Sequence, residues 1–256
     1  EEALALGIVD VETVLAGGLW RVRWTQGSRR AVGAGSKGSE GLLDRLVDRE
    51  GAVLDVRVVP GGELVRLAVG VEAQRPYAPG QFLTLRVPSD RTGSVARCYS
   101  LCSSPFTGDP MTVTVKRTTD GYASNWLCDN AHAGMKIHVL APSGTFVPKT
   151  LDTDFLLLAA GSGITPMMAI CKSALAEGSG KVVLIYANRD ESSVIFRQEL
   201  AELSGEYPDR LVVVHWLESV QGPPPLAQLR SFASFFPSQP SSVCGPAADQ
   251  MAVDAA

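Results

Sequence analysis

The stretch from Phe155 to Met168 reads Phe-Leu-Leu-Leu-Ala-Ala-Gly-Ser-Gly-Ile-Thr-Pro-Met-Met and decides the fold of the second half of this chain. Its opening apolar run is typical of a strand buried on both faces. Gly161 and Gly163 then permit a tight turn, because neither carries a Cβ. We expect Thr165 to be the N-cap of the following helix and Pro166 its first residue. A strand, a glycine turn and a helix N-terminus together present amide N–H groups to an anion, most often a phosphate.

The segments that follow repeat this strand-and-helix unit. Helical spacing continues as far as Gly178, and Lys181 to Ala187 and Leu211 to Trp216 have the composition of two further buried strands. Residues 193–203, between those strands, have helical spacing. Alternating strands and helices predict a doubly wound parallel α/β sheet with a binding crevice at the carboxyl ends of its strands. An ordinary βα turn stays open as the alternative, because Pro166 stands where the dinucleotide fingerprint has a third glycine or alanine.

Composition narrows the class of protein. The 256 residues suit two domains, and 45% apolar with 20% charged residues is typical of a soluble globular protein. A net charge of −4 argues against a nucleic-acid or anionic-membrane partner. No apolar run approaches the roughly 18 residues of a membrane span, and no signal peptide is evident at the start. We therefore expect a cytoplasmic protein without a membrane segment.

The cysteines and histidines show no metal-site pattern. The cysteines are odd in number and scattered in apolar contexts, which predicts free thiols in a reducing compartment. No pair has the spacing of a zinc site or of a plant-type iron–sulfur site. We expect no metal site. The five cysteines are Cys98, Cys102, Cys128, Cys171 and Cys244.

From Val53 onward the pattern is that of an all-β domain. Short strands with turn residues such as Pro79-Gly80 between them predict a small antiparallel six-stranded β-barrel. One helix is expected within this domain, from Ala123 to Ala131. The six expected strands are Val53–Val59, Leu64–Val71, Gln81–Val87, Ala96–Cys102, Met111–Arg117 and Lys136–Leu140.

The domain boundaries follow from these patterns. Residues 1–52 are expected to be an N-terminal extension and linker, residues 53–150 the barrel, and residues 151–256 the α/β domain, truncated at its C-terminus. Within the extension, Leu19 to Trp24 alternates tryptophan with arginine, which fits a short strand or a basic-aromatic patch; we favour a solvated extension without a binding role. Residues 31–41 have the composition of a flexible linker, and residues 42–49 that of a short helix.

Five short motifs, in this order, resemble the ferredoxin–NADP reductase family. Within it, the run from Tyr77 to Trp216 is most similar to the reductase components of bacterial oxygenases, namely those of 3-ketosteroid 9α-hydroxylation and of phenylacetyl-CoA oxygenation. Several ordered motifs are more specific than any one of them. The motifs are Pro79-Gly80-Gln81-Phe82, Arg97-Cys98-Tyr99-Ser100, Gly121-Tyr122-Ala123-Ser124, Gly161-Ser162-Gly163-Ile164-Thr165-Pro166 and Cys244-Gly245-Pro246.

The resemblance implies an FAD site on the barrel. Arg97 offers a fixed charge to the pyrophosphate, and Tyr99, on the same face of a regular strand, can stack on the flavin ring. The family gives the neighbouring Ser100 a hydrogen bond to flavin N5, and it places Cys98 in the same motif. Val115 is expected to meet the sugar or the ring. A barrel strand with a surface arginine and a core tyrosine is the structural alternative.

The remaining flavin residues lie at a helix start. Gly121, Ala123 and Ser124 open the expected helix, where amide donors and the helix dipole favour a phosphate. Ser124 would contact the pyrophosphate opposite Arg97. The resemblance thus implies FAD rather than FMN.

The resemblance also implies a nicotinamide nucleotide on the second domain. Gly161, Gly163 and Thr165 would hold its pyrophosphate. Asn188 and Arg189, with Asp190 beside them, come at the end of the second strand, where the adenosine ribose is read. An acidic residue there favours NADH and an arginine can accept NADPH, so both cofactors stay open, with NADH preferred.

The last motif supplies the expected nicotinamide contact. The resemblance places Cys244 against the nicotinamide and makes it, with Ser100, a catalytic residue; Gly245 and Pro246 follow it as cofactor-binding residues. Residues 238–242 approach this motif through a polar sequence rather than an apolar strand. A buried cysteine at a strand end is the alternative.

The function implied is that of an FAD-dependent NAD(P)H oxidoreductase. It would pass hydride from NADH to flavin and electrons to a ferredoxin or a Rieske-type oxygenase component, in steroid 9α-hydroxylation by resemblance. Full-length relatives continue into a plant-type ferredoxin domain, so a 2Fe–2S cluster is expected only in a separate or missing domain. The alternatives are a stand-alone ferredoxin or flavodoxin reductase and a flavin-binding remnant without efficient turnover.

Overall fold

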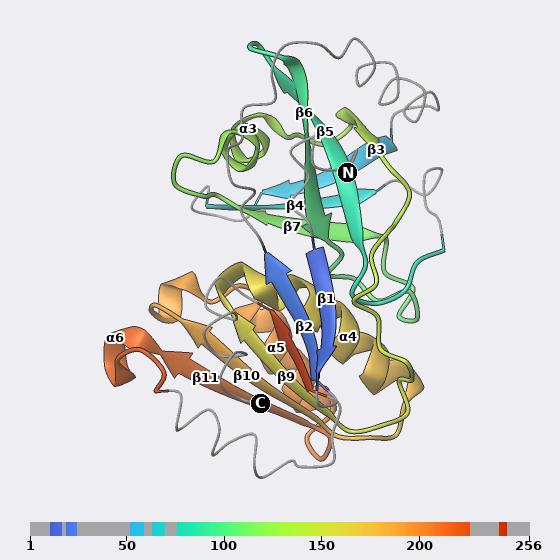
Figure 1. Ribbon diagram of the computed structural model, residues 1–256, viewed down its shortest axis with the longest axis vertical. Coiled ribbons are helices and arrows are strands. Elements are labelled where there is room, and N and C mark those ends of the chain that lie inside the picture. The colour runs from blue at the N-terminus through green and yellow to red at the C-terminus, as the bar shows by residue number, and fades with distance from the viewer. Residues whose placement is uncertain are drawn as a thin grey trace.

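The computed structural model describes residues 63–69 and 76–225 in full, together with the backbone of the strands at residues 11–16, 19–24, 52–58 and 241–244. The strands among these residues form two six-stranded sheets, which lie one above the other in Figure 1. The first lies in the order β6-β5-β8-β3-β4-β7 and the second in the order β1-β2-β12-β9-β10-β11.

The first sheet is the expected antiparallel barrel. Every pairing between its strands is antiparallel, and alternate residues such as Val65, Leu67 and Val69 are buried to form its core. This alternation is the reason why the sequence pattern identified the strands. The strands are β3 (Ala52–Val58), β4 (Leu64–Val69), β5 (Phe82–Ser89), β6 (Gly93–Ser100), β7 (Thr112–Lys116) and β8 (Lys136–Val139).

The barrel closes between the two edge strands of this sheet. A bridge between Leu101, which follows β6, and Val113 of β7 joins the two edges, and the Cys102 N–H donates to Thr112 O at 2.9 Å. Helix α3 (Tyr122–Asn130) follows β7 and buries Leu127 in the same core. The expected six-stranded barrel with one helix is therefore confirmed.

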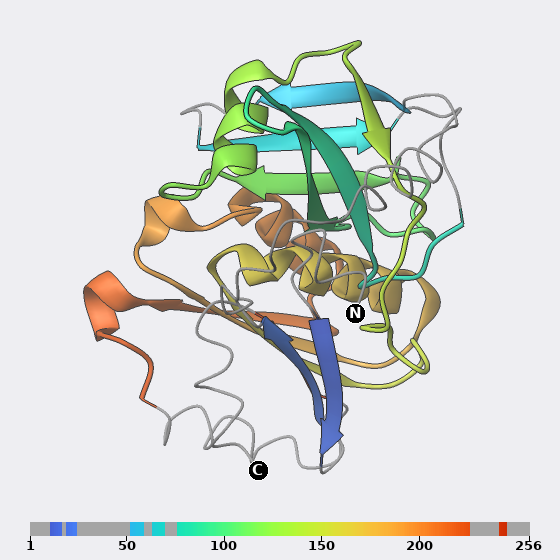
Figure 2. The same ribbon diagram turned by 45° about the horizontal axis from the view of Figure 1, so that its top comes forward.

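The second sheet has the expected parallel part. Strands β12 (Ser241–Cys244), β9 (Phe155–Ala160), β10 (Val182–Asn188) and β11 (Leu211–Leu217) run parallel to their neighbours. Helices α4 (Ile164–Glu177) and α5 (Arg197–Glu206) connect the central strands. Phe155, Leu157 and the other residues of that face form one apolar cluster with α4, and Figure 2 shows α4 between the sheet and the barrel.

Two helix starts differ from the sequence prediction. Thr165 is not the N-cap of α4, because a 3₁₀ turn at Gly161–Gly163 (η2) begins the helix earlier and makes Gly163 the N-cap. The helix expected from residue 193 begins at Arg197 instead. A capping box between Asp190 and Ser193 closes a second 3₁₀ turn, Glu191–Ser193 (η3), and Phe196 then takes a left-handed backbone (φ 62°) before α5.

The strands nearest the chain ends join the second sheet. β1 (Val11–Ala16) and β2 (Leu19–Trp24) form an antiparallel pair, and β2 runs parallel to β12. Leu19 to Trp24 is thus a short strand within the second sheet, and the solvated extension that the sequence favoured for it is wrong. A short helix, α6 (Glu218–Gln221), follows β11. The expected linker and helix at residues 31–49 lie outside the described residues, and the domain boundaries stay a prediction.

Candidate functional site

The motif Arg97–Ser100 lies at the carboxyl end of β6, beside the barrel seam. Arg97 is exposed, and its Nη1 donates to Ala96 O at 2.7 Å. Tyr99 is half-buried against the barrel core, and this burial raises the pKa of its phenol to about 12, against the effect of the Arg97 charge. The side chain of Tyr99 is therefore a neutral aromatic surface with a guanidinium nearby, as stacking and phosphate binding require.

The other two residues of the motif are also half-buried. The Cys98 Sγ lies 3.4 Å from Thr84 Oγ1, and burial raises the pKa of the thiol, so Cys98 is a protonated thiol at neutral pH. Ser100 pairs across the sheet with Phe82. The described hydrogen bonds of Cys98 do not disclose a catalytic role.

The seam beside this motif is closed by the bridge at Leu101 and Val113, but the described strands β6 and β7 are not paired beyond it. Leu101 and Val113 form the bridge between the β6 and β7 edges, and continuing its antiparallel register would set Tyr99 opposite Val115. Among the described pairings, none joins β6 to β7 at that level. Val115 is fully buried in the barrel core, and its expected contact with the flavin stays a prediction.

The start of α3 provides a close-packed turn near the seam. Gly121 is the N-cap of α3, and a Cβ there would lie 2.7 Å from Ser124 Oγ. The Ser124 hydroxyl donates to Gly121 O at 3.1 Å and accepts from the Thr118 N–H at 3.2 Å, and Ala123 is buried beside it. The first amide N–H groups of a helix have no partner within it, so this turn can receive an anion.

The glycine turn after β9 forms the corresponding site on the second domain. Gly161 has a left-handed backbone (φ 51°), which glycine adopts without strain, whereas Gly163 is in the ordinary helical region. Thr165 lies in the first turn of α4, and its Oγ1 donates to Ser162 O at 3.1 Å. The turn thus holds the amide groups of the helix start at the carboxyl edge of the sheet.

Tyr186 is a residue of this site that the sequence analysis missed. It is fully buried on β10, and its hydroxyl donates to Gly161 O at 2.9 Å and accepts from the Ile195 N–H at 3.3 Å. Burial raises the pKa of the phenol strongly, so it stays a neutral donor. Through these two hydrogen bonds, Tyr186 connects the glycine turn to the segment before α5. No sequence signal marks this role, since buried aromatic residues in strands are common.

The end of β10 carries the predicted ribose-reading residues. Asn188 is buried, and among the described residues neither its Nδ2 nor its Oδ1 has a hydrogen-bond partner of good geometry, although the amide is close enough to the Tyr186 phenol to lower its burial-raised pKa. A buried amide without partners is unfavourable, so this group fits a polar ligand such as a nucleotide. Arg189 is exposed. Asp190 Oδ1 is already bound, accepting from Ser192 Oγ at 2.6 Å and the Ser193 N–H at 2.9 Å.

Cys244 ends β12 at the same edge of the sheet. Its backbone pairs with Ala159 of β9, just before the glycine turn. The polar approach to this residue therefore does form a strand. The side chain of Cys244 and the whole of Gly245 and Pro246 lie outside the described residues.

The barrel seam and the carboxyl edge of the second sheet lie near each other. Lys116, the last residue of β7, is half-buried, and this burial lowers the pKa of its ammonium. The charge of Arg189 lowers this pKa further, while Asp190 raises it. Residues at the ends of β7 and β10 are thus within electrostatic reach of each other.

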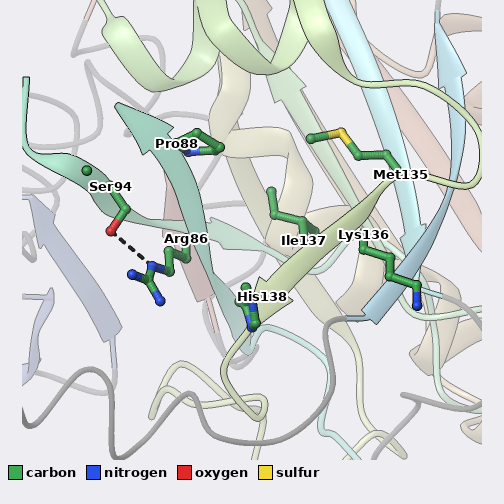
Figure 3. A pocket seen from close by; sticks show the side chains of 8 residues that line it. Arg86, Pro88, Ser94, Met135, Lys136, Ile137 and His138 are labelled. Atoms are coloured by element: carbon green, nitrogen blue, oxygen red, sulfur yellow. Dashed lines mark hydrogen bonds between the residues drawn. The ribbon is translucent and has the colours of Figure 1, made fainter. Parts of the chain in front are cut away.

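A separate hollow of about 350 Å³ lies on the barrel (Figure 3). Arg86 of β5 reaches across to Ser94 of β6 there, with 3.0 Å between Arg86 Nε and Ser94 Oγ. None of the predicted flavin residues lines this hollow. Its lining consists of Arg86, Pro88, Gly93, Ser94, Met135, Lys136, Ile137 and His138.

The described residues hold neither a metal-binding cluster nor a membrane-spanning helix. No group of three or more histidine, cysteine or acidic residues is placed to hold a metal ion in the part of the chain that the structure describes. Among the same residues, no helix is long and apolar enough to cross a membrane.

Both domains match families of known proteins. Residues 53–147 match the oxidoreductase FAD-binding domain family and residues 157–231 the oxidoreductase NAD-binding domain family. A ferredoxin-NADP+ reductase from Plasmodium falciparum in complex with 2'P-AMP has a TM-score of 0.67 at 19% identity, over 80% of this chain and 90% of that one. The FAD/NAD-binding domain of nitric oxide dioxygenase from Vibrio cholerae has a TM-score of 0.64 at 23% identity, over 81% and 92%. These two likenesses show the fold.

Curated relatives give a more specific likeness. The ferredoxin reductase component of 3-ketosteroid-9-alpha-monooxygenase from Mycolicibacterium smegmatis is 78% identical over 170 residues, which are 66% of this chain and 48% of the relative. The component of the same name from Rhodococcus rhodochrous is 66% identical over the same shares. A component of the 1,2-phenylacetyl-CoA epoxidase from Escherichia coli is 41% identical over 55% of this chain and 40% of that one. The chain spans about half the length of these relatives.

The chain carries an oxidoreductase FAD-binding domain followed by an oxidoreductase NAD-binding domain. Among these proteins it is most like the reductase components of 3-ketosteroid-9-alpha-monooxygenases.

Proposed function

We propose that this chain transfers hydride from NADH to FAD and passes the electrons on to an iron–sulfur acceptor of an oxygenase system. The observation that carries the proposal is that the barrel, which matches the FAD-binding domain family, packs directly against the domain that matches the NAD-binding domain family, with Cys102 and Phe146 of the barrel side inside the apolar cluster of the second sheet. It supports a flavin on the barrel and a nicotinamide nucleotide on the sheet that meet at one place. A flavin accepts a two-electron hydride and can release its electrons one at a time.

The residues of this chain would bind and orient the two cofactors. Arg97 and the N-terminus of α3 would hold the FAD pyrophosphate, with Tyr99 against the ring and Ser100 at N5. The turn at Gly161–Gly163 would hold the pyrophosphate of NADH. The unpartnered amide of Asn188 supports a polar ligand at the carboxyl edge of the sheet.

The nucleotide preference and the remaining roles are part of this proposal. We favour NADH, with NADPH as the alternative that Arg189 could serve. Cys244 would lie against the nicotinamide, with Gly245 and Pro246 beside it. A cytoplasmic location is also part of the proposal, because the four described cysteines are free thiols, as in a reducing compartment.

The acceptor is proposed from the curated relatives. Those relatives are named as reductase components of 3-ketosteroid-9-alpha-monooxygenase, so we propose a ferredoxin or a Rieske-type oxygenase component as acceptor and steroid 9α-hydroxylation as the process. We expect this chain alone to transfer electrons poorly to an oxygenase. Efficient steroid hydroxylation with this chain as the sole reductase, without added ferredoxin, would contradict that expectation.

An anaerobic titration tests the proposal. The FAD-reconstituted chain is titrated with NADH and then with NADPH while the visible absorbance of the flavin is followed. Bleaching by NADH at low concentration supports hydride transfer and the NADH preference together. A flavin that neither nucleotide bleaches refutes the proposed activity and favours a flavin-binding remnant.

A further inference from the structure

Four charged side chains alternate in sign across the boundary between the two domains. Arg66 Nη2 of β4 lies 2.9 Å from Glu199 Oε2 of α5, and the other oxygen of Glu199 pairs with Lys172 of α4. Lys172 Nζ in turn lies 3.8 Å from Asp109 Oδ2 in the loop that follows β6. Arg66 and Asp109 belong to the barrel domain, so this charge chain crosses the boundary twice, and Glu199 is at its centre.

The centre of the charge chain is protected from water. The side chains of Lys172 and Glu199 are 13% and 23% exposed, against 34% for Arg66 and 47% for Asp109. Partly buried ion pairs are screened by salt less than surface pairs. The Arg66 guanidinium also lies over the ring of the buried Phe196, 4.6 Å from its centroid, next to the start of α5. Arg66 is therefore held by both a carboxylate and an aromatic face.

Uncharged contacts close the same boundary. Ser104 Oγ and Ser173 Oγ form a buried hydrogen bond of 2.9 Å between the barrel domain and α4. Cys102 and Phe146, from the barrel side, are members of the apolar cluster built by the second sheet and α4. Domains of one chain usually move relative to each other unless their interface is large and apolar. Here a packed interface carries the charge chain, so the contacts favour one relative orientation.

We infer that Glu199 is a positioning residue, which fixes the orientation of the nucleotide domain against the barrel and thereby the approach of the nicotinamide to the flavin. This inference rests on the proposed function. Hydride transfer needs the reacting atoms in a narrow range of positions, and a misplacement of about 1 Å can reduce a rate about 100-fold. Glu199 acts through Arg66 and Lys172 and touches neither cofactor site described above.

Removal of the Glu199 charge replaces two attractive ion pairs at the boundary by the repulsion between Arg66 and Lys172. Without this charge, Arg66 and Lys172 share no carboxylate among the described ion pairs, and Asp109 is too far from Lys172, at 3.8 Å, to replace a direct pair fully. Glu199→Gln keeps the shape of the side chain, so the change is electrostatic. Breaking a partly buried pair is unfavourable because the partner charges stay desolvated.

The test compares Glu199→Gln with a matched control, Glu202→Gln. Glu202 lies on the same helix and lines the same hollow as Lys172, but its described hydrogen bond is to Gln198 at 2.8 Å, within α5. Its variant therefore tests whether the paired carboxylate of Glu199 matters, rather than any negative charge beside Lys172. In the FAD-loaded full chain we expect Glu199→Gln to slow flavin reduction at saturating NADH about tenfold, as for a small misplacement. We expect the affinities for FAD and for ADP-ribose to change less than about twofold, because the substitution lies at the boundary and leaves the interior of each cofactor-binding domain unchanged. Glu202→Gln should leave all three values as in the wild type.

A second readout does not depend on activity. Calorimetric unfolding of the chain should show weaker coupling between the two domains in Glu199→Gln, as a broader transition or as two transitions, and not in Glu202→Gln. Wild-type reduction rate and unfolding profile in Glu199→Gln would overturn the inference. Loss of ADP-ribose binding in that variant would also overturn it, since the residue would then act on the nucleotide site.

If Glu199→Gln does not fold, a milder variant can test the same inference. Arg66→Gln removes only the outer pair and keeps the pair between Glu199 and Lys172, so we expect a smaller slowing of reduction in the same direction. An unchanged rate in Arg66→Gln would overturn the inference. If NADH does not reduce the wild-type flavin, the proposed function fails, while the unfolding experiment still decides whether Glu199 couples the domains.

Discussion

Replacing Tyr186 by phenylalanine removes a single hydroxyl from the nucleotide domain. Phenylalanine fills the same space in the fully buried position, so the change leaves the packing of the ring intact. Two hydrogen bonds are lost, one to Gly161 O and one from the Ile195 N–H. The prediction is that the variant folds but binds the nicotinamide nucleotide more weakly, because the glycine turn loses its connection to β10.

The size of the effect follows from the two partners. Gly161 O also accepts from the Ile164 N–H, so it keeps one bond, whereas the Ile195 N–H belongs to a buried residue and is left unpaired. One unsatisfied buried group and one lost bond amount to about 1–3 kcal/mol of stability. If binding must supply about 1.4 kcal/mol of this free energy to order the glycine turn around the nucleotide, the Kd for the nucleotide rises about tenfold.

Isothermal titration of the oxidised, FAD-loaded chain with ADP-ribose measures this directly, because ADP-ribose cannot reduce the flavin. Tyr207→Phe is the control, since it removes a hydroxyl from a half-buried tyrosine of the same domain at the end of α5. We expect a lower melting temperature and a weaker ADP-ribose affinity in Tyr186→Phe, with an unchanged FAD affinity. An unchanged ADP-ribose affinity alongside a lower melting temperature would refute the reasoning and leave Tyr186 a purely structural residue.

Three further predictions concern the described residues. Gly121→Ala should weaken FAD binding at least severalfold, measured by flavin fluorescence, because the new Cβ would lie 2.7 Å from Ser124 Oγ; an unchanged affinity would count against the turn. Cys171, whose thiol pKa burial raises to about 12, and the buried Cys102 should react with a thiol reagent only after unfolding; rapid reaction in the folded chain would contradict this. Partial desolvation and the nearby Arg197 charge lower the pKa of the solvent-exposed His215 below its usual 6.5, so the unfolded chain binds a proton first and stability should fall slightly as the pH decreases below about 6.5; thermal melts of His215→Gln should lose that small part of the dependence.

The sequence pattern predicted most of the fold because it depends on local properties. Alternating burial marks β4 of the barrel, and the continuous apolar run marks β9, whose residues are all buried. These patterns reflect which faces of a strand are covered, and that is encoded residue by residue. The same logic identified Gly161 as a turn glycine, and its left-handed backbone confirms it.

The starts of α4 and α5 show where local patterns were insufficient. The sequence pattern predicts Thr165 as the cap of one helix and residue 193 as the start of the other, yet the structure begins the helices at Ile164 and Arg197. A 3₁₀ turn precedes each helix, and its hydrogen bonds compete with a cap that the sequence alone would favour. Helix periodicity does not distinguish a residue within the first turn from the residue that caps it.

The sequence by itself determined two domains, their strand patterns and the motifs that predict cofactor sites on each. Only the tertiary structure decided that Tyr186 bonds Gly161, 25 positions away, and that Arg66 pairs with Glu199, 133 positions away. The physical reason is that burial patterns are written along each strand or helix, whereas a hydrogen bond or an ion pair depends on the distance between atoms that the packing of whole domains brings together.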